Sequence, residues 1–345
     1  MMRSLVVRPD NAGDVLLAGP AVRAVAAGSE MVVLLAGPNG RDAAELLPGV
    51  DEVVTWRVPW IDPAPGPVDP DEVAAMVKTL HAYDLDRAVV LTSFHQSPLP
   101  TALLLRLAGV PWVGAISEDY PGSLLDLRHH VDGDLPEAER ALSLARAAGF
   151  ALPPDDDGRL DVRRPLPDVT GFVPGLAPGE RYVVLHPGTS VPARAWPVHR
   201  WREACVLLTD RGHRVVVTGT EAEADLTGEV AAAQAVDLGG RTTLAELAAV
   251  LDRAGVVVAG NTGPAHLAAA VGTPVVSLFA PTVPAARWAP WGVPMVLLGD
   301  QQAPCRDTRA TTCPVPGHPC LTAVTAGEVL AAVDELGAPG DRRRG

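Results

Sequence analysis

The chain of 345 residues has a single lysine, Lys78, and only 4% of its residues are aromatic. We attribute the scarcity of lysine to genomic base composition rather than to a function. Long hydrophobic runs are also missing, since no apolar segment approaches the ~20 residues that a membrane-spanning helix needs. Arg3 is not followed by the extended apolar segment of a secretion signal. The sequence therefore predicts a soluble cytoplasmic protein.

Acidic residues outnumber basic ones, with 41 Asp and Glu against 28 Lys and Arg. The net charge of −13 argues against a general nucleic-acid-binding surface, so an anionic ligand must be held locally by a few arginines and helix ends. No GxGxxG motif follows a predicted strand, which disfavours a two-domain dehydrogenase. The Asp-x-Asp pattern at Asp84 and Asp86 fits an ordinary turn between a helix and a strand. The sequence thus offers no cofactor motif and no convincing Asp-x-Asp metal site, and we predict no cofactor.

Four cysteines are present, and none of them forms a CxxC pair. Cys205 lies in an apolar helical stretch, where a buried thiol is expected. Cys305, Cys313 and Cys320 share a proline-rich segment with His318. This set is a weak candidate for a structural Cys3His zinc site, and reduced thiols packed in a loop are the simpler interpretation.

Short apolar runs alternate with helical runs along the whole chain, which is typical of parallel sheets covered on both faces. The predicted strands are Leu5–Val7, Met31–Leu35, Glu52–Thr55, Ala88–Leu91, Trp112–Ala115, Tyr182–Leu185, Arg214–Thr218, Ala235–Leu238, Val256–Ala259, Val275–Phe279 and Met295–Leu298. The clearest predicted helices are Val15–Ala27, Val198–Asp210, Glu223–Ala233, Thr243–Leu251 and Ala326–Leu336. Thr243 and Glu246 have the spacing of a capping box.

The length exceeds that of one ordinary core, so we predict two Rossmann-like domains that face a cleft. The first covers residues 1–165 and a proline-rich linker covers 166–180. The second covers 181–337, and 338–345 is a flexible tail. The last helix, Ala326–Leu336, could pack on either domain, because its sequence alone does not choose between them.

The first candidate site is the turn from Arg8 to Asp14, which contains Gly13 and links a strand to a helix. Asp14 at the helix start is either a helix-stabilising acid or a general base at the edge of the cleft. Asp10 is a second candidate, although Asp within a turn often closes an Asx turn.

The second domain holds a matching turn, Gly260 to His266, whose helix start could bind phosphate through backbone N–H groups. Earlier in the same domain, Thr189 and Ser190 offer hydroxyl groups and Arg194 offers a guanidinium that suits a diphosphate. As alternatives, Arg194 is a solvated loop residue and His266 is a packed core histidine. Glu223 either binds a ribose hydroxyl or is an acid in the first turn of its helix.

These segments together resemble glycosyltransferase family 9, the ADP-heptose:lipopolysaccharide heptosyltransferases and their relatives. The resemblance depends on five ordered blocks: Arg8-x5-Asp14 with Gly13, His186-Pro187-Gly188-Thr189-Ser190, Arg194-Ala195-Trp196-Pro197, Gly219-x3-Glu223, and Asn261-Thr262-Gly263-Pro264-x-His266. It implies a GT-B fold and an inverting, metal-independent transfer from a nucleotide-diphospho-sugar.

The resemblance also implies roles for individual residues. Asp14 matches the proposed catalytic base. The donor-binding positions are Thr189, Ser190, Arg194, Glu223, Asn261, Thr262, Gly263 and His266. Asn261 departs from the Asp of many heptosyltransferases, which leaves the donor sugar open, with ADP-heptose favoured.

The resemblance implies the chemical class of the acceptor but not its identity. The acceptor is a glycan, a lipid-linked glycan at the inner membrane face, or a small molecule. The competing functions are a sugar-nucleotide 2-epimerase of the same architecture and a non-catalytic nucleotide-sugar-binding protein. The first would need more acid and base groups than Asp14 supplies, and the joint presence of Asp14 and Arg194 disfavours the second.

Overall fold

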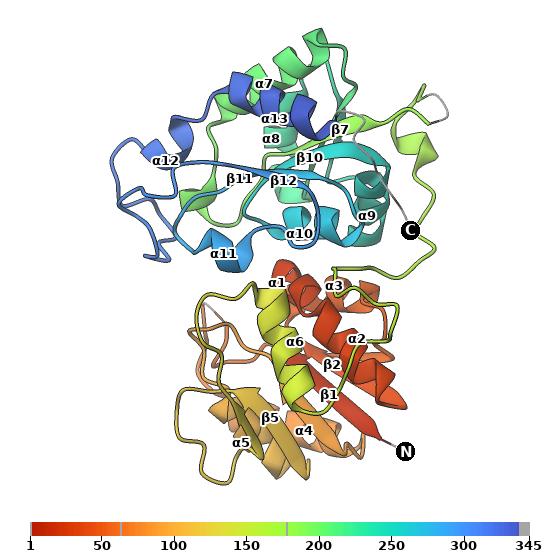
Figure 1. Cartoon of the computed structure of the whole chain (residues 1–345), viewed down its shortest axis with the longest axis vertical. Helices are drawn as coiled ribbons and strands as arrows, with labels where there is room; N and C mark the ends of the chain where they lie inside the picture. Colours follow the sequence, from red (N-terminus) through yellow and green to blue (C-terminus); the bar gives the residue numbers. More distant parts are fainter. Residues whose placement is uncertain (1, 63, 177–178, 338–345) are drawn as a thin grey trace. The chain divides into compact units, whose positions relative to one another are not determined.

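The computed structural model describes residues 2–62, 64–176 and 179–337. The chain divides into two compact units between Arg163 and Arg164, called here unit 1 and unit 2 (Figure 1). Each unit contains one six-stranded parallel sheet flanked by helices, as the alternation of apolar runs predicts. The tail predicted at 338–345 lies outside the described residues.

Unit 1 has the strand order β3-β2-β1-β4-β5-β6. Its strands are β1 Arg3–Arg8, β2 Met31–Ala36, β3 Glu52–Thr55, β4 Arg87–Val90, β5 Trp112–Ile116 and β6 Leu127–His129. Its helices are α1 Ala12–Leu17, α2 Gly19–Ala27, α3 Arg41–Leu46, α4 Pro70–His81, α5 Leu99–Leu107 and α6 Glu137–Ala147, with the 3₁₀ turn η1 Pro38–Gly40. The sequence analysis did not predict strand β6, because its three residues carry no apolar pattern.

The helix predicted as Val15–Ala27 is two helices, which meet at Ala18. Pro20 in the first turn of α2 has no N–H to bond the carbonyl of Leu16, so the continuous α-helical ladder ends there. The break leaves α1 as a short helix directly after the turn that carries Asp10.

The sheet of unit 1 is buried on both faces. Alternate β1 residues such as Leu5 and Val7 form a core cluster with Met76 and Leu80 of α4 and Leu105 of α5. Helices α2 and α6 contact one another and lie together in front of β1 and β2 in Figure 1. The carboxyl ends of the strands are therefore the edge where polar loops can gather.

Unit 2 has the strand order β12-β11-β10-β7-β8-β9. Its strands are β7 Tyr182–His186, β8 Val215–Gly219, β9 Val236–Gly239, β10 Ala254–Gly260, β11 Val275–Leu278 and β12 Met295–Leu298. Its helices are α7 Val198–Asp210, α8 Ala224–Ala231, α9 Leu244–Arg253, α10 Gly263–Ala270, α11 Ala285–Trp288, α12 Pro319–Thr322 and α13 Ala326–Gly337. Short 3₁₀ turns are η2 Thr170–Phe172, η3 Pro192–Arg194 and η4 Glu221–Glu223. The predicted capping box is confirmed, because Glu246 N donates to Thr243 Oγ1 at 3.2 Å and Thr243 N donates to Glu246 Oε2 at 2.8 Å.

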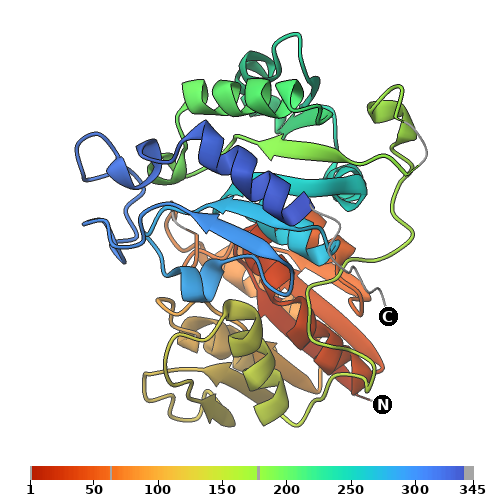
Figure 2. The same ribbon diagram turned by 45° about the horizontal axis from the view of Figure 1, so that its top comes forward.

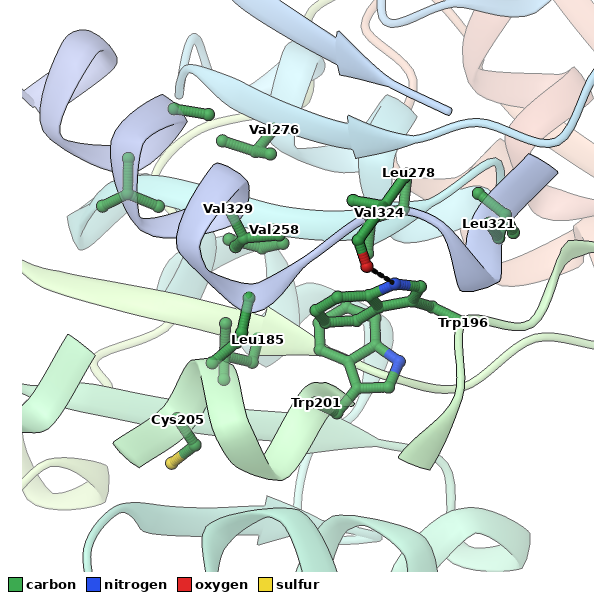
Figure 3. Close-up of a cluster of buried hydrophobic side chains, with 14 of the residues drawn as sticks. Leu185, Trp196, Trp201, Cys205, Val258, Val276, Leu278, Leu321, Val324 and Val329 are labelled. Atoms are coloured by element: carbon green, nitrogen blue, oxygen red, sulfur yellow. Dashed lines mark hydrogen bonds between the residues drawn. The ribbon is translucent and has the colours of Figure 1, made fainter. Parts of the chain in front are cut away.

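Helix α13 packs within its own unit, against α7 and strands β10, β11 and β12 (Figure 2). Val329 lies in the same buried cluster as Leu185 and Trp201 (Figure 3). Burial of apolar surface against this sheet therefore places α13 on unit 2, a choice that its sequence left open.

Trp196 and Trp201 pack edge to face at 5.1 Å, and Trp196 Nε1 donates to the carbonyl of Val324 at 3.2 Å (Figure 3). Trp196 thus links the loop after β7 to the segment before α13. In the described part of the chain, no helix combines the length and apolarity needed to cross a bilayer.

Candidate functional site

Both sheets reverse their winding direction at one place. In unit 1 the reversal falls between β1 and β4, and in unit 2 between β7 and β10. The loops that leave two such strands separate to opposite sides of the sheet, so ligands of open α/β folds bind between them at the carboxyl ends of the strands. The two glycine turns singled out in the sequence follow β1 and β10.

In unit 2, the loop after β7 brings Arg194 to this reversal point. Arg194 is the last residue of η3 and is half-buried. Its Nη1 donates to the backbone carbonyl of Asn261, just after β10, at 3.3 Å. The guanidinium therefore spans the two loops rather than pointing into solvent, which contradicts the solvated-loop interpretation.

Asn261 and His266 lie beside Arg194 and are both buried. Within the described residues, Asn261 Nδ2 and His266 Nδ1 have no hydrogen-bond partner. Buried polar atoms of native proteins are nearly always bonded, so two such atoms within the segment that follows β10 indicate a ligand or ordered water. Burial, assisted by the charge of Arg194, lowers the pKa of His266 to about 4. His266 is therefore neutral at pH 7, with one ring nitrogen able to donate and the other to accept.

The start of α10 supplies backbone donors at the same point. Thr262 is the N-cap, and its Oγ1 donates to the carbonyl of Gly260 at 3.4 Å instead of capping the helix. The first N–H groups of a helix have no intrahelical acceptor and carry the positive end of its dipole. Arg194, the N–H of Gly263 and this dipole together form a site suited to a phosphate group.

The two hydroxyl groups predicted to bind phosphate, those of Thr189 and Ser190, differ in how available they are to a ligand. Thr189 Oγ1 accepts from the N–H of Val191 at 3.1 Å and donates to the carbonyl of Val191 at 3.3 Å, so it stabilises its own turn. Ser190 beside it is exposed. Ser190 is consequently the more available hydroxyl of the two.

Glu223 lies on the other side of β7, after β8. Its Oε2 accepts from the N–H of Thr220 at 2.8 Å and from Thr220 Oγ1 at 2.9 Å, which is one half of a capping box. Its carboxylate also lies against Gly188. Nearby, burial lowers the pKa of His186 to about 4, even though Glu223 acts in the opposite direction. The structural interpretation of Glu223 is thus confirmed, and the nucleoside-binding role stays a prediction.

Unit 1 presents Asp14 in the first turn of α1, three residues after the N-cap Asn11. The carboxylate pairs with Arg8, whose Nη2 donates to Asp14 Oδ1 at 3.1 Å. Gly13 is buried beneath this turn. A small polar cavity of about 50 Å³ lies next to it and is lined by Asp10, Asn11, Asn39, Arg57 and Asp62 among others.

The predicted zinc candidate is not assembled. His318 Nε2 donates to the carbonyl of Ala193 at 3.1 Å, and Cys313 Sγ donates to the carbonyl of Val315 at 3.4 Å. Among the described residues, no group of three or more His, Cys, Asp or Glu side chains is arranged to hold a metal ion. Burial, together with Cys305, raises the pKa of the Cys320 thiol to about 12. Cys305 and Cys320 are buried free thiols, and Cys313 is a partly buried one.

Sequence reasoning missed three residues. Ser93, in the loop after β4, and Glu137, the first residue of α6, contact Arg8, and Gln96 in the same loop bonds Ser93 and Asp10. Because β4 neighbours β1 across the reversal point, the polar residues after β4 could have been found by asking which loop faces the first turn. Nothing in the sequence around Glu137 signals its contact with Arg8.

Comparison with known proteins now identifies the family. A family model described as glycosyltransferase family 9 (heptosyltransferase) matches residues 73–318, well over half of the chain. The chain belongs to glycosyltransferase family 9. The protein is accordingly a glycosyltransferase enzyme, and the predicted family is confirmed. The matched range contains Arg194, Glu223 and the 261–266 turn, whereas Asp14 precedes it. A search among curated proteins gives no match.

Solved structures confirm the GT-B fold. A glycosyltransferase family 9 protein from Veillonella parvula is 15% identical, with a TM-score of 0.79 and 98% of each chain covered. E. coli ADP-heptose LPS heptosyltransferase II is 21% identical, with a TM-score of 0.72, covering 97% of this chain and 98% of its own. E. coli heptosyltransferase WaaC with ADP is 22% identical, with a TM-score of 0.69 and coverage of 97% and 100%.

Proposed function

We propose that this family 9 glycosyltransferase moves heptose or a related sugar from a nucleotide-diphospho-sugar to an acceptor hydroxyl, by an inverting and metal-independent displacement with Asp14 as the base. One observation supports the proposed binding of the donor. Arg194, bonded to the carbonyl of Asn261 beside the start of α10, forms a cationic site at the reversal point of the sheet in unit 2.

On the donor side, the diphosphate binds Arg194 and the N–H groups at the start of α10. The negative charge that develops on the leaving diphosphate is stabilised there, a task that a metal ion performs in other enzymes. Asn261 Nδ2 and His266 Nδ1, unpartnered among the described residues, are available for hydroxyl groups of the donor. Ser190 and Glu223 complete the donor-binding set, with Glu223 toward the nucleoside.

On the acceptor side, Asp14 accepts the proton of the attacking hydroxyl. The new bond forms at the anomeric carbon while the bond to the diphosphate breaks, so the configuration at that carbon is inverted. A carboxylate suits this role when one of its oxygens is accessible and the other is fixed by the protein. Asp14 meets both conditions, because it is only half-buried and its Oδ1 is bonded to Arg8.

Likeness in fold to the E. coli heptosyltransferases favours ADP-heptose as the donor, and we place the reaction in the cytoplasm. All four cysteines are free thiols, which agrees with a reducing compartment. The acceptor belongs to the glycan, lipid-linked or small-molecule classes. Family membership favours transfer over 2-epimerisation.

A ligand screen tests the donor assignment. We expect ADP and ADP-heptose to raise the melting temperature of the protein, and UDP and GDP to do so less, because ligands that bind only the folded state stabilise it by mass action. The variant Arg194→Ala should lose this shift. Arg202→Ala, at an exposed position of α7, is the matched control and should keep it. A shift that survives in Arg194→Ala would refute the proposed phosphate site.

A further inference from the structure

Arg8 lies at the centre of a buried polar network under Asp14. It is the last residue of β1, and its side chain is only 3% exposed. Besides Asp14, its Nη2 donates to Ser93 Oγ at 3.2 Å, and its Nε lies 3.2 Å from Asp10 Oδ2. Because this guanidinium is deeply buried and paired with protein groups, we expect any effect it has on the reaction to act through its neighbours.

Three carboxylates surround this one guanidinium, and they differ in access to solvent. The side chains of Asp10 and Glu137 are 9% and 2% exposed, whereas that of Asp14 is 20% exposed. Asp14 is therefore the member that a substrate hydroxyl can reach most easily. Glu137 lies 3.8 Å from Arg8 Nη2 and, with Asp10, balances its charge from the interior.

The inner partners are themselves held from other elements. Gln96 Nε2 donates to Asp10 Oδ1 at 2.7 Å, and Gln96 Oε1 accepts from the N–H of Ser93 at 2.9 Å. Burial raises the pKa of the Asp10 carboxyl group, while Arg8 and Gln96 act against that shift. Through these bonds, the loop after β4 fixes the direction of the Arg8 side chain.

Helix α6 supports the network from a further side. Glu137 lies 3.5 Å from Arg140 Nη1, and the same Nη1 donates to the carbonyl of Thr92 at 2.6 Å. Four segments, namely β1, α1, the loop after β4 and α6, thus converge on one guanidinium. Long side chains normally lose much conformational entropy when they are ordered, and here that ordering is complete before any ligand arrives.

We propose that Arg8 is a positioning residue for the base: it holds Asp14 Oδ1, so that Oδ2 is directed to accept the proton of the acceptor hydroxyl. This inference rests on the proposed function of Asp14. Lysine at position 8 keeps the positive charge between Asp10 and Glu137, but its single ammonium group cannot reproduce the fork of the guanidinium. Arg8→Lys therefore tests orientation without leaving buried carboxylates uncompensated.

The experiment measures kcat, donor KM and ADP affinity in Arg8→Lys, Ser93→Ala, Asp14→Asn and the double variant Arg8→Lys/Asp14→Asn. We expect Arg8→Lys to lower kcat about 10- to 100-fold, the loss of one charge-assisted hydrogen bond. Donor KM and ADP affinity stay unchanged. Ser93→Ala, which removes one bond to Arg8 and no charge, lowers kcat by a smaller factor. In the Asp14→Asn background, Arg8→Lys has no further effect, because both changes act on one step.

Arg23→Lys is the matched control. Arg23 forms a two-point pair with Asp156 in the same unit, with Nε and Nη2 at 2.5 and 2.8 Å from the carboxylate oxygens. Its substitution should lower the melting temperature about as much as Arg8→Lys and leave kcat unchanged.

The possible failures are distinguishable. Normal kcat in Arg8→Lys with loss of activity in Asp14→Asn overturns the positioning role and leaves the base assignment intact. Activity retained in Asp14→Asn overturns the proposed function itself. Equal losses of kcat in Arg8→Lys and Arg23→Lys would reduce the role of Arg8 to general stability, which also contradicts the inference.

Discussion

Gly188 lies directly against the carboxylate of Glu223: a Cβ atom at position 188 would come well within 3.0 Å of Glu223 Oε1. The two residues follow neighbouring strands, β7 and β8, so they meet at the same edge of the sheet in unit 2. The glycine of the His-Pro-Gly-Thr-Ser segment is therefore required by packing. It leaves room for the acid that caps the turn at Thr220.

We predict that Gly188→Ala destabilises the protein by about 1–3 kcal/mol through overpacking and weakens ADP binding. Chemical denaturation and calorimetry measure the two effects. In a Glu223→Ala background, the added methyl group should cost less, because the carboxylate that it meets is gone. Gly171→Ala, where a Cβ has open space, is the control. Equal costs in both backgrounds would contradict the packing relationship.

Asp14→Asn should lower the rate of transfer about 10²–10⁴-fold while leaving ADP affinity close to that of the wild type. Asn is nearly isosteric and can still accept a bond from Arg8, but it cannot take a proton from the acceptor. Steady-state kinetics and calorimetry on the same preparation separate the two quantities. If ADP affinity collapses and bound donor is still consumed at the normal rate, Asp14 is a binding residue.

Arg194→Ala should weaken ADP binding by a factor corresponding to about 1.5–3 kcal/mol, the usual contribution of a charge-assisted hydrogen bond. Arg194→Lys should recover part of the loss, because it restores the charge without the second donor. Titration calorimetry with ADP measures both. An affinity in Arg194→Ala equal to that of the wild type would remove this residue from the phosphate site.

The buried His266 should make the protein acid-sensitive. Its pKa falls from 6.5 to about 4 on folding, so the unfolded chain binds a proton below pH 6.5 that the folded chain does not. Stability is therefore lost as the pH falls from 6.5 toward 4, by on the order of 2 kcal/mol at pH 4.5. His266→Gln should show a correspondingly smaller loss of stability between pH 7 and pH 4.5 in denaturant titrations, and His199→Gln, at an exposed position, should behave like the wild type. Identical pH dependence of His266→Gln and the wild type would contradict a buried neutral His266.

Transfer should proceed at the full rate in excess EDTA. Arg194 and the start of α10 can neutralise the departing diphosphate without a cation. We also expect no stoichiometric metal in elemental analysis, and Cys313→Ser should be as active as the wild type. Activity that is abolished by the chelator and restored by Mg²⁺ or Mn²⁺ would refute the mechanism. Zinc near one per chain, lost in Cys313→Ser, would refute only the structural part of this prediction.

The sequence by itself determined the two parallel sheets and most of their strands. Runs such as Leu5–Val7 and Val256–Ala259 are apolar without alternation, because both faces of these sheets are covered. Such runs can be recognised from the local sequence alone. Helix α7 begins and ends where it was predicted, at Val198 and Asp210, because apolar side chains recur along it with helical spacing. The turns after β1 and β10 were also located from the sequence, since a glycine turn between strand and helix is a local pattern.

Only the tertiary structure decided which of these local features meet. Arg8 and Glu137 are far apart in the chain and approach to 3.8 Å because β1 and α6 belong to one packed unit. The contact of Gly188 with Glu223 and the bond from His318 to Ala193 likewise depend on neighbouring loops. Local patterns report the propensity and burial of each segment. Long-range contacts depend on strand order and helix docking, which are set by burial of apolar surface across the whole unit.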